Sequence, residues 1–159
     1  MRKFLVAVLV VVLPGCALYI PPEKHTFEKT RVVNKSYDKV WSNLVTWFAD
    51  NNIPVRFMEK ASGFVTTEYN LDVSDTAYCD CGGNDIGQRF DISVGNLNVV
   101  VEAIDANSTR VTVNTFYRCW AFNPMMQGSA LPLFREKSSF ARGESTGGLE
   151  AEIFKGVTR

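Results

Sequence analysis

The sequence predicts an α+β domain: one antiparallel sheet with a long amphipathic helix and a short C-terminal helix packed on it, in the order β-α-β-β-β-β-β-α. Three observations predict this class. Apolar residues recur at helical spacing over residues 36–52, the period changes to two over residues 53–120, and helical spacing returns after residue 144. Strands that follow one another through short turns favour antiparallel pairing, with one face of the sheet covered and the other wet.

Residues 28–35 are expected to form the first strand, and residues 36–52 the helix that follows it. The helix has a wide apolar stripe in which neighbours lie three or four positions apart. The stripe consists of Tyr37, Val40, Trp41, Leu44, Trp47 and Phe48. Ser36 suits the N-cap position, and the polar residues 50–52 suit the end of the helix. We expect the two tryptophans to fill the core rather than to stack on a ligand.

The alternating region is expected to hold five strands, rich in β-branched and aromatic residues. They are placed over residues 53–60, 64–70, 87–95, 97–105 and 108–120. Gly63 marks the turn between the first two, and Gly95-Asn96 marks a tight turn between the third and fourth. The last helix is expected within residues 144–156, opening near Ser145 or Thr146. Its inward face would hold Leu149, Ile153 and Phe154.

The N-terminus predicts the cellular compartment. Two basic residues precede an apolar run over residues 4–13. The run is too short for a membrane span of about 20 residues and is typical of a secretory signal peptide. LPGC at residues 13–16 resembles the bacterial lipoprotein signal. The resemblance implies cleavage before Cys16, acylation of Cys16 and anchoring to outer-membrane lipid on the periplasmic face, since Ala17 and not aspartate follows. The alternative is an ordinary secretory signal with Cys16 as a plain thiol.

This signal divides the chain into three regions. They are a lipoprotein signal peptide over residues 1–15, a lipidated N-terminus and extended tether over residues 16–27, and a single α+β domain over residues 28–159. Cleavage leaves 15 basic and 17 acidic side chains with no basic cluster, so nucleic-acid binding is not expected. The only histidine, His25, lies in the tether and is expected to be solvated.

A second resemblance covers residues 36–69. A helix that contains Val40-Trp41 precedes a strand, a glycine turn and a threonine-rich strand. This order resembles the helix-grip domains of bacterial envelope lipoproteins, including those in the lipoprotein C subunit of the outer-membrane β-barrel assembly machinery. STGGLE at residues 145–150 is similar to helix starts in lipoproteins of this size. The resemblance implies a helix-grip-like fold, and it specifies a fold more than an activity.

The cysteine count predicts a disulfide. The chain contains Cys16, Cys79, Cys81 and Cys119. If Cys16 is acylated, three thiols remain in an oxidising compartment, so one is left over. Cys119 is expected to pair with Cys81 or Cys79, and a bridge between Cys79 and Cys81 would close a small, strained ring. Cys81 is slightly preferred as the partner, because the glycine pair after it allows a close approach of the backbone.

A metal site is the alternative use of the same cysteines. Three thiolates and an oxygen of Asp80 or Asp85 would form a tetrahedral set. Zinc ligands usually have C-x₂₋₄-C spacing rather than C-x-C, and an oxidising compartment favours the disulfide. We therefore expect neither a metal nor another cofactor. A redox-active dithiol would show C-x-x-C, which the sequence lacks.

No catalytic motif is present: the sequence lacks G-x-S-x-G, H-E-x-x-H and a phosphate loop, so no enzyme is expected. The leading hypothesis is a non-enzymatic protein-binding or structural module with an envelope protein as its partner. An apolar stretch would form the contact. It contains Phe122, Met125, Met126, Leu131, Leu133 and Phe134. Alternatively, these residues cover the sheet. The second hypothesis is a carrier or sensor of a small apolar ligand in a helix-grip cavity.

Overall fold

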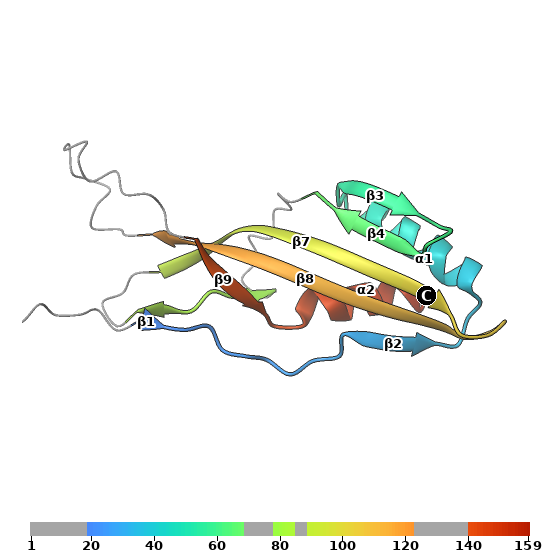
Figure 1. The fold of residues 1–159 in the computed structure, drawn as a ribbon, viewed down its shortest axis with the longest axis horizontal. Helices are drawn as coiled ribbons and strands as arrows, with labels where there is room; N and C mark the ends of the chain where they lie inside the picture. The colour runs from blue at the N-terminus through green and yellow to red at the C-terminus, as the bar shows by residue number, and fades with distance from the viewer. Residues whose placement is uncertain (1–18, 69–77, 85–88, 123–139) are drawn as a thin grey trace, which may run out of the picture.

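The computed structural model describes residues 19–68, 78–84, 89–122 and 140–159. Within them the chain forms an α+β fold with an antiparallel sheet and two helices, as the sequence predicts. The central element is a hairpin of two long strands, β7 (Arg89–Ala103) and β8 (Thr109–Phe122), which runs along the molecule (Figure 1). The two halves of this hairpin have different neighbours.

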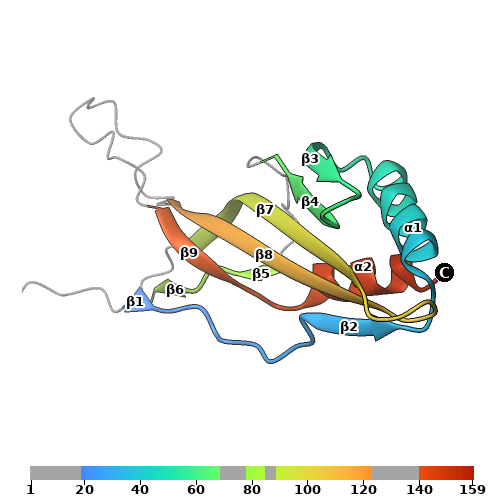
Figure 2. The ribbon, with the colours of Figure 1, turned by 45° about the vertical axis from the view of Figure 1, so that its right-hand side comes forward.

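The half nearest the hairpin turn carries three further strands and both helices. β2 (Thr30–Val33) pairs with β8, β4 (Phe64–Thr67) pairs with β7, and β3 (Val55–Glu59) pairs with β4. The helices α1 (Tyr37–Asp50) and α2 (Gly148–Val157) pack against each other, and also against β7 and β8 respectively (Figure 2). We call this end the helix-covered half.

The other half of the hairpin is extended by strands alone. β9 (Phe140–Ser145) pairs with β8, and β5 (Cys79–Asp80) pairs with β9. On the opposite edge, β6 (Gly83–Asn84) pairs with β7, and β1 (Tyr19–Ile20) pairs with β6. We call this end the cysteine half, because Cys79, Cys81 and Cys119 meet there. The sequence did not predict β1, β5, β6 or β9.

Helix α1 has 14 residues, an ordinary length for a globular protein and not the long helix that the sequence predicts. Its buried residues belong to the predicted stripe. They are Val40, Trp41, Leu44, Trp47 and Phe48. Gly156 of α2 lies so close to the indole of Trp47 that a side chain there would collide with it. The two tryptophans therefore fill the core between the helices and the sheet, as expected.

The alternation of apolar residues is confirmed in the half of the hairpin nearest its turn, whereas the register shift between Ile92 and Val94 interrupts it further along β7. The inward-facing side chains of the helix-covered half are at most 2% exposed, and they are Leu97, Val99, Val101, Val111 and Val113. Leu149, Ile153 and Phe154 of α2 meet them from the helical side, as the sequence predicts. Burial of this many aliphatic side chains, each contributing about 1.5–3 kcal/mol, is the main stabilisation of this half.

The predicted turn at Gly95-Asn96 is wrong. β7 continues through both residues, and Gly95 pairs with Tyr117 while Asn96 pairs with Phe116. Turn propensity is a local signal, and here a continuous ladder to β8 overrides it. The irregularity in β7 lies instead between Ile92 and Val94, where the register shifts. The two strands that the sequence predicts are therefore one strand of 15 residues.

A second register shift lies in β3, between Val55 and Phe57. A bulge adds one residue to one side of a strand pair and so reverses which side chains face inward. Met58 consequently packs against the core, whereas the side chain of Phe57 is 49% exposed. Strict alternation along this strand would instead place Phe57 on the same face as Val55.

The start of α2 explains the STGGLE segment. Gly147 is the N-cap residue and has a left-handed backbone, with φ of 88°, which favours glycine. The hydroxyl of Ser145 donates to the carboxylate of Glu150 at 2.9 Å and accepts the backbone N–H of Gly147 at 3.1 Å. The helix begins slightly later than expected because Ser145 still belongs to β9.

Candidate functional site: a basic cleft beside a cysteine cluster

A cleft of about 660 Å³ opens between the segment 25–29 and the strands β7, β8 and β9. Its lining from β8 includes Phe116 and Arg118, and its lining from β9 includes Arg142 and Glu144. Clefts of this volume are typical of sites for small ligands or a few side chains of a partner. The cleft is therefore the first candidate for a binding site.

Strand alternation places the charged lining of the cleft. Because Tyr117 faces inward, its neighbours Phe116 and Arg118 face the opposite side of the sheet. Arg118 pairs directly with Arg142 across the β8–β9 ladder, so two cationic side chains share one face of the strand pair. Like charges at such positions disfavour pairing by themselves. Glu144 of β9 also lines the cleft, so the charged lining includes one carboxylate beside these cations.

The segment that precedes β2 supplies the opposite wall. His25 and Lys29 line the cleft together with Phe27. The Lys29 ammonium lies 5.5 Å from the centre of the Phe27 ring, and the backbone carbonyl of Lys29 accepts the N–H of Val113 at 2.8 Å. The segment is therefore held against β8. The cleft is lined by three cations, Lys29, Arg118 and Arg142, by one carboxylate, Glu144, and by the rings of Phe27 and Phe116, of which Phe116 is 50% exposed.

Hydroxyl groups of Thr115, Tyr117 and Ser145 also line the cleft, and two of them bond the carboxylate of Glu150, which is not part of the lining. Thr115 donates to Glu150 at 2.5 Å, and Ser145 donates to the same carboxylate. Glu150 is only 1% exposed. Burial, with the negative charge of Glu150, raises the pKa of the Tyr117 hydroxyl. That hydroxyl has no hydrogen-bond partner within the described residues.

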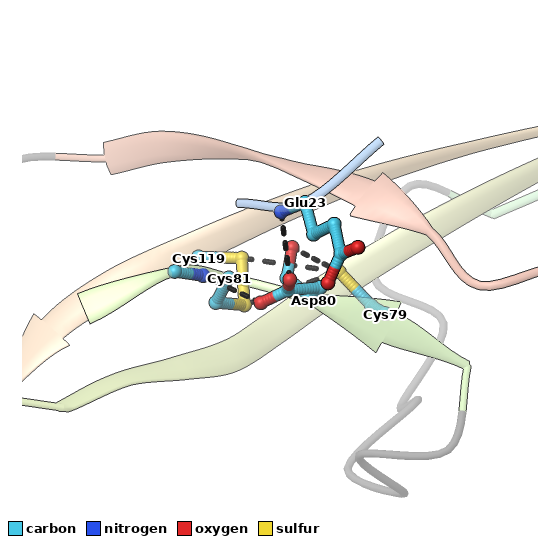
Figure 3. The surroundings of a disulfide bond; sticks show 6 residues. Glu23, Cys79, Asp80, Cys81 and Cys119 are labelled. Atoms are coloured by element: carbon cyan, nitrogen blue, oxygen red, sulfur yellow. Dashed lines mark hydrogen bonds between the residues drawn. A yellow bond between two sulfur atoms is a disulfide. The ribbon is translucent and has the colours of Figure 1, made fainter. Parts of the chain in front are cut away.

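Behind this wall lies the cysteine cluster shown in Figure 3. Cys81 and Cys119 form a disulfide with their Cα atoms 5.7 Å apart, which is the pairing that the sequence slightly favours. Cys79 is a free, buried thiol. Its sulfur lies 3.9 Å from that of Cys81 and 4.0 Å from that of Cys119. The unpaired thiol therefore touches both sulfurs of the disulfide.

Asp80 fixes the loop between the two neighbouring cysteines. One carboxylate oxygen accepts the N–H of Gly82 and the other accepts the N–H of Glu23, each at 2.8 Å. Asp80 also pairs with Glu144 in the β5–β9 ladder. The segment that the sequence assigns to a tether is thereby joined to the cluster at Glu23, and β1 joins it to β6.

Gly143 separates the cleft from the cluster. It lines the cleft, and a Cβ atom built on it would overlap the sulfurs of Cys79 and Cys119. Only glycine therefore lets β9 lie this close to the three sulfurs. Burial, together with the nearby carboxylates of Asp80 and Glu144, raises the pKa of the Cys79 thiol to about 12. Cys79 is consequently a neutral thiol at neutral pH and a poor nucleophile.

Several sequence-predicted site residues lie outside the described residues. They are Cys16, Met125, Met126, Leu131, Leu133 and Phe134. Phe122 ends β8 and pairs with Arg89. Sequence reasoning did not identify Phe116, Arg118 or Arg142 as site residues. The signal was present for the first two, since they alternate with inward-facing Tyr117, but Arg142 enters only through the unpredicted strand β9.

Comparison with known proteins adds no assignment. No family model matches the chain, and no curated protein matches it. Neither helix in the described part of the chain has the length and apolar character needed to cross a membrane. The signal in the sequence and the cleft are therefore the two features that point to a function.

Proposed function

We propose that the chain is a lipid-anchored lipoprotein of the bacterial outer membrane, facing the periplasm, that binds an envelope protein without catalysing a reaction. The observation that carries the binding function is the cleft, in which exposed Phe116 lies among Lys29, Arg118 and Arg142. The lipoprotein-type signal at residues 13–16 supports the anchor. The fold that we propose for this module is helix-grip-like, with both helices on one face of the sheet.

The anchor sets the orientation of the module. β1 begins at Tyr19, three residues after Cys16, and three residues span at most about 11 Å. Acylation of Cys16 would therefore bring the β1–β6 end close to the bilayer. The β7–β8 turn lies at the opposite end of the molecule (Figure 1). In this orientation the module stands upright on the membrane, with the cleft between its two ends.

The cleft favours an acidic protein segment as its ligand. Carboxylates of the partner would pair with Arg118 and Arg142, and Arg is suited to two parallel hydrogen bonds with a carboxylate. An apolar side chain of the partner would cover Phe116. A small apolar ligand between helix and sheet is the less favoured function, because side chains fill that interface, with Val40, Leu44 and Leu97 all at 0% exposure.

In-cell photo-crosslinking tests the proposal. A photoreactive amino acid at position 116 is expected to give a discrete adduct with an envelope protein, whereas the same group at Ile104, which is 46% exposed at the far end of the hairpin, is not. The double variant Arg118→Glu/Arg142→Glu should lose the adduct at position 116. The double variant Lys39→Glu/Lys155→Glu reverses two exposed helix charges and should keep it. Equal adducts at both positions, or an adduct that survives reversal at Arg118 and Arg142, would refute the cleft as the binding site.

A further inference from the structure

The three cysteines of the described residues come from two places in the sequence and meet at one point. Cys79 lies in β5, Cys81 follows it in the loop, and Cys119 lies in β8. Their sulfur atoms all lie within 4.8 Å of one another. The three side chains are 4%, 5% and 0% exposed respectively. The disulfide explains why the sulfurs of Cys81 and Cys119 lie together, but it does not explain why the sulfur of Cys79 lies beside them.

We propose that reduction of the disulfide turns this cluster into a site for one Cu(I) ion, held by the thiolates of Cys79, Cys81 and Cys119. The site is independent of the cleft and of the partner proposed for it. The structure with the Cys81–Cys119 disulfide is then the oxidised, metal-free state of this site. Cys79 takes no part in the disulfide, and in the reduced state it supplies the third ligand.

The distances between the sulfurs match a trigonal site. Metal–thiolate bonds of about 2.3 Å place three sulfurs in a plane about 4.0 Å apart. The distances from Cys79 to Cys81 and to Cys119, 3.9 and 4.0 Å, already have this value. Only the third distance has to change, and it lengthens when the bond between Cys81 and Cys119 is broken.

Backbone pairing holds the frame around the sulfurs together with the disulfide. Cys119 is held in the ladders of β8 with β7 and with β9, where it pairs with Ile92 and Ala141. Cys79 is held by its pairing with Ser145 in β9. The loop to Cys81 is held by the two hydrogen bonds of Asp80. Rotation of the Cys81 and Cys119 side chains can therefore separate their sulfurs while the strands stay paired.

The donor set selects the ion. Soft thiolate ligands favour Cu(I) and zinc among biological metals, and structural zinc takes four ligands. Here the cluster offers three sulfurs, both oxygens of the nearest carboxylate, Asp80, already accept backbone N–H groups, and burial keeps water away. Three thiolates in a dry pocket suit Cu(I), which is stable with three ligands, better than zinc.

Reduction of the disulfide and binding of Cu(I) are two separate steps. A dithiol reductant gives two electrons and two protons to the Cys81–Cys119 disulfide and becomes a disulfide itself, leaving two thiols beside Cys79. Cu(I) then replaces the three thiol protons, which pass to the solvent, and the ion remains monovalent. The reductant must reach a buried bond, so reduction is expected to be slower than for an exposed disulfide.

The test uses the full chain, purified in detergent, reduced with a phosphine and titrated anaerobically with Cu(I) against a competing chelator. We expect one ion per chain in the reduced protein, none in the oxidised protein, and X-ray absorption from three sulfur ligands. Zinc, added in the same way, should bind at least tenfold more weakly. An acylated Cys16 would be a thioether and would not compete as a thiolate.

Cys79→Ser is the decisive variant, because it removes one ligand and keeps the Cys81–Cys119 bridge available to verify the fold in the oxidised state. Its affinity for Cu(I) should fall at least 100-fold. The proposal is overturned if the reduced wild-type chain binds no Cu(I), if only two sulfurs coordinate the ion, or if Cys79→Ser binds as tightly as the wild type. Cys79→Ala should give the same loss, which separates ligation from an effect of the serine hydroxyl.

Discussion

The helix-covered half and the cysteine half share the same two strands, β7 and β8, but they are stabilised differently. In the helix-covered half, sixteen buried residues from both helices and four strands form one apolar core. Among the described side chains, the buried cluster of the cysteine half consists of Cys79, Cys81, Tyr117 and Cys119, none of them from a helix. A small core of this kind usually needs a covalent link. The disulfide therefore replaces, at one end of the hairpin, what the helices supply at the other.

The largest expected loss of stability comes from truncating a buried side chain in the core of the helix-covered half. Phe154 is 1% exposed in the helix-covered half, and Phe154→Ala should lower the free energy of unfolding by about 3–5 kcal/mol through lost burial and a residual cavity. Phe57→Ala, at a phenylalanine that is 49% exposed, is the matched control and should cost less than about 1 kcal/mol. Chemical denaturation followed by tryptophan fluorescence measures both. Equal losses would contradict the placement of the core.

The second largest loss of stability is expected from removing the Cys81–Cys119 disulfide. The double variant Cys81→Ser/Cys119→Ser opens a loop of 38 residues, and chain entropy predicts a loss of about 4 kcal/mol, with typical measured values of about 2–4 kcal/mol. Hydrogen exchange should show the loss of protection mainly in β5 and β9, and much less in β2 and β4. Uniform loss over both halves would mean that the two halves unfold as one unit.

The single variant Cys81→Ser sharpens this comparison. Cys79 lies 4.0 Å from Cys119, so it can take the place of the missing partner when the protein is oxidised. We expect peptide mapping to find a Cys79–Cys119 bridge, and a stability loss clearly smaller than that of the double variant. Two free thiols in the oxidised single variant would show that Cys79 cannot reach Cys119.

A smaller effect is expected at the glycine between the cleft and the cluster. Gly143→Ala places a Cβ atom against the sulfurs of Cys79 and Cys119, and overpacking of this kind costs about 1–3 kcal/mol. Combining it with Cys79→Gly should recover part of the loss, because one of the two overlapping sulfurs is gone. A double-mutant cycle measures this coupling. Strict additivity would show that Gly143 and Cys79 do not share the space.

The same division between the halves separates what the sequence predicts from what it does not. Leu97, Val99, Val111 and Val113 follow from alternation, since a period of two is readable within a few residues. The stripe of α1 is readable for the same reason. The cysteine half depends on partners far apart in the chain. β5 and β6 are two-residue strands that form beside the longer strands β9 and β7, and the two-residue strand β1 pairs with β6 in turn.

The residues of the cleft could likewise be predicted from the sequence only in part. Phe116 and Arg118 could be assigned to the outer face from the sequence, but not the neighbours that make them part of a site. Arg142 reaches Arg118 through β9, and His25 reaches the cleft because the preceding segment lies along the sheet. Gly95-Asn96 was misread for a related reason, since a turn signal is local whereas the ladder to β8 is not.

The smallest effect, and the most specific to the cysteine half, is a loss of stability in alkali. The pKa of Cys79 is about 12 in the folded protein and near 9 as an ordinary thiol. Below pH 9 both states keep the proton, so the contribution is fully present. Between pH 9 and 12 the unfolded chain releases the proton while the folded chain keeps it, and the free energy of unfolding falls as pH rises. The loss should be about 1 kcal/mol between pH 9 and 10.

Cys79→Ser identifies the source of that loss, because serine does not titrate in this range. Denaturation at pH 8, 9 and 10 should give a flatter profile for the variant than for the wild type. Tyr117 also has a raised pKa, but an unfolded tyrosine releases its proton about one unit later than a thiol, so Tyr117→Phe should alter the profile only above pH 10. If the wild type and Cys79→Ser lose stability equally between pH 9 and 10, Cys79 is not the buried neutral thiol on which the cysteine half is built.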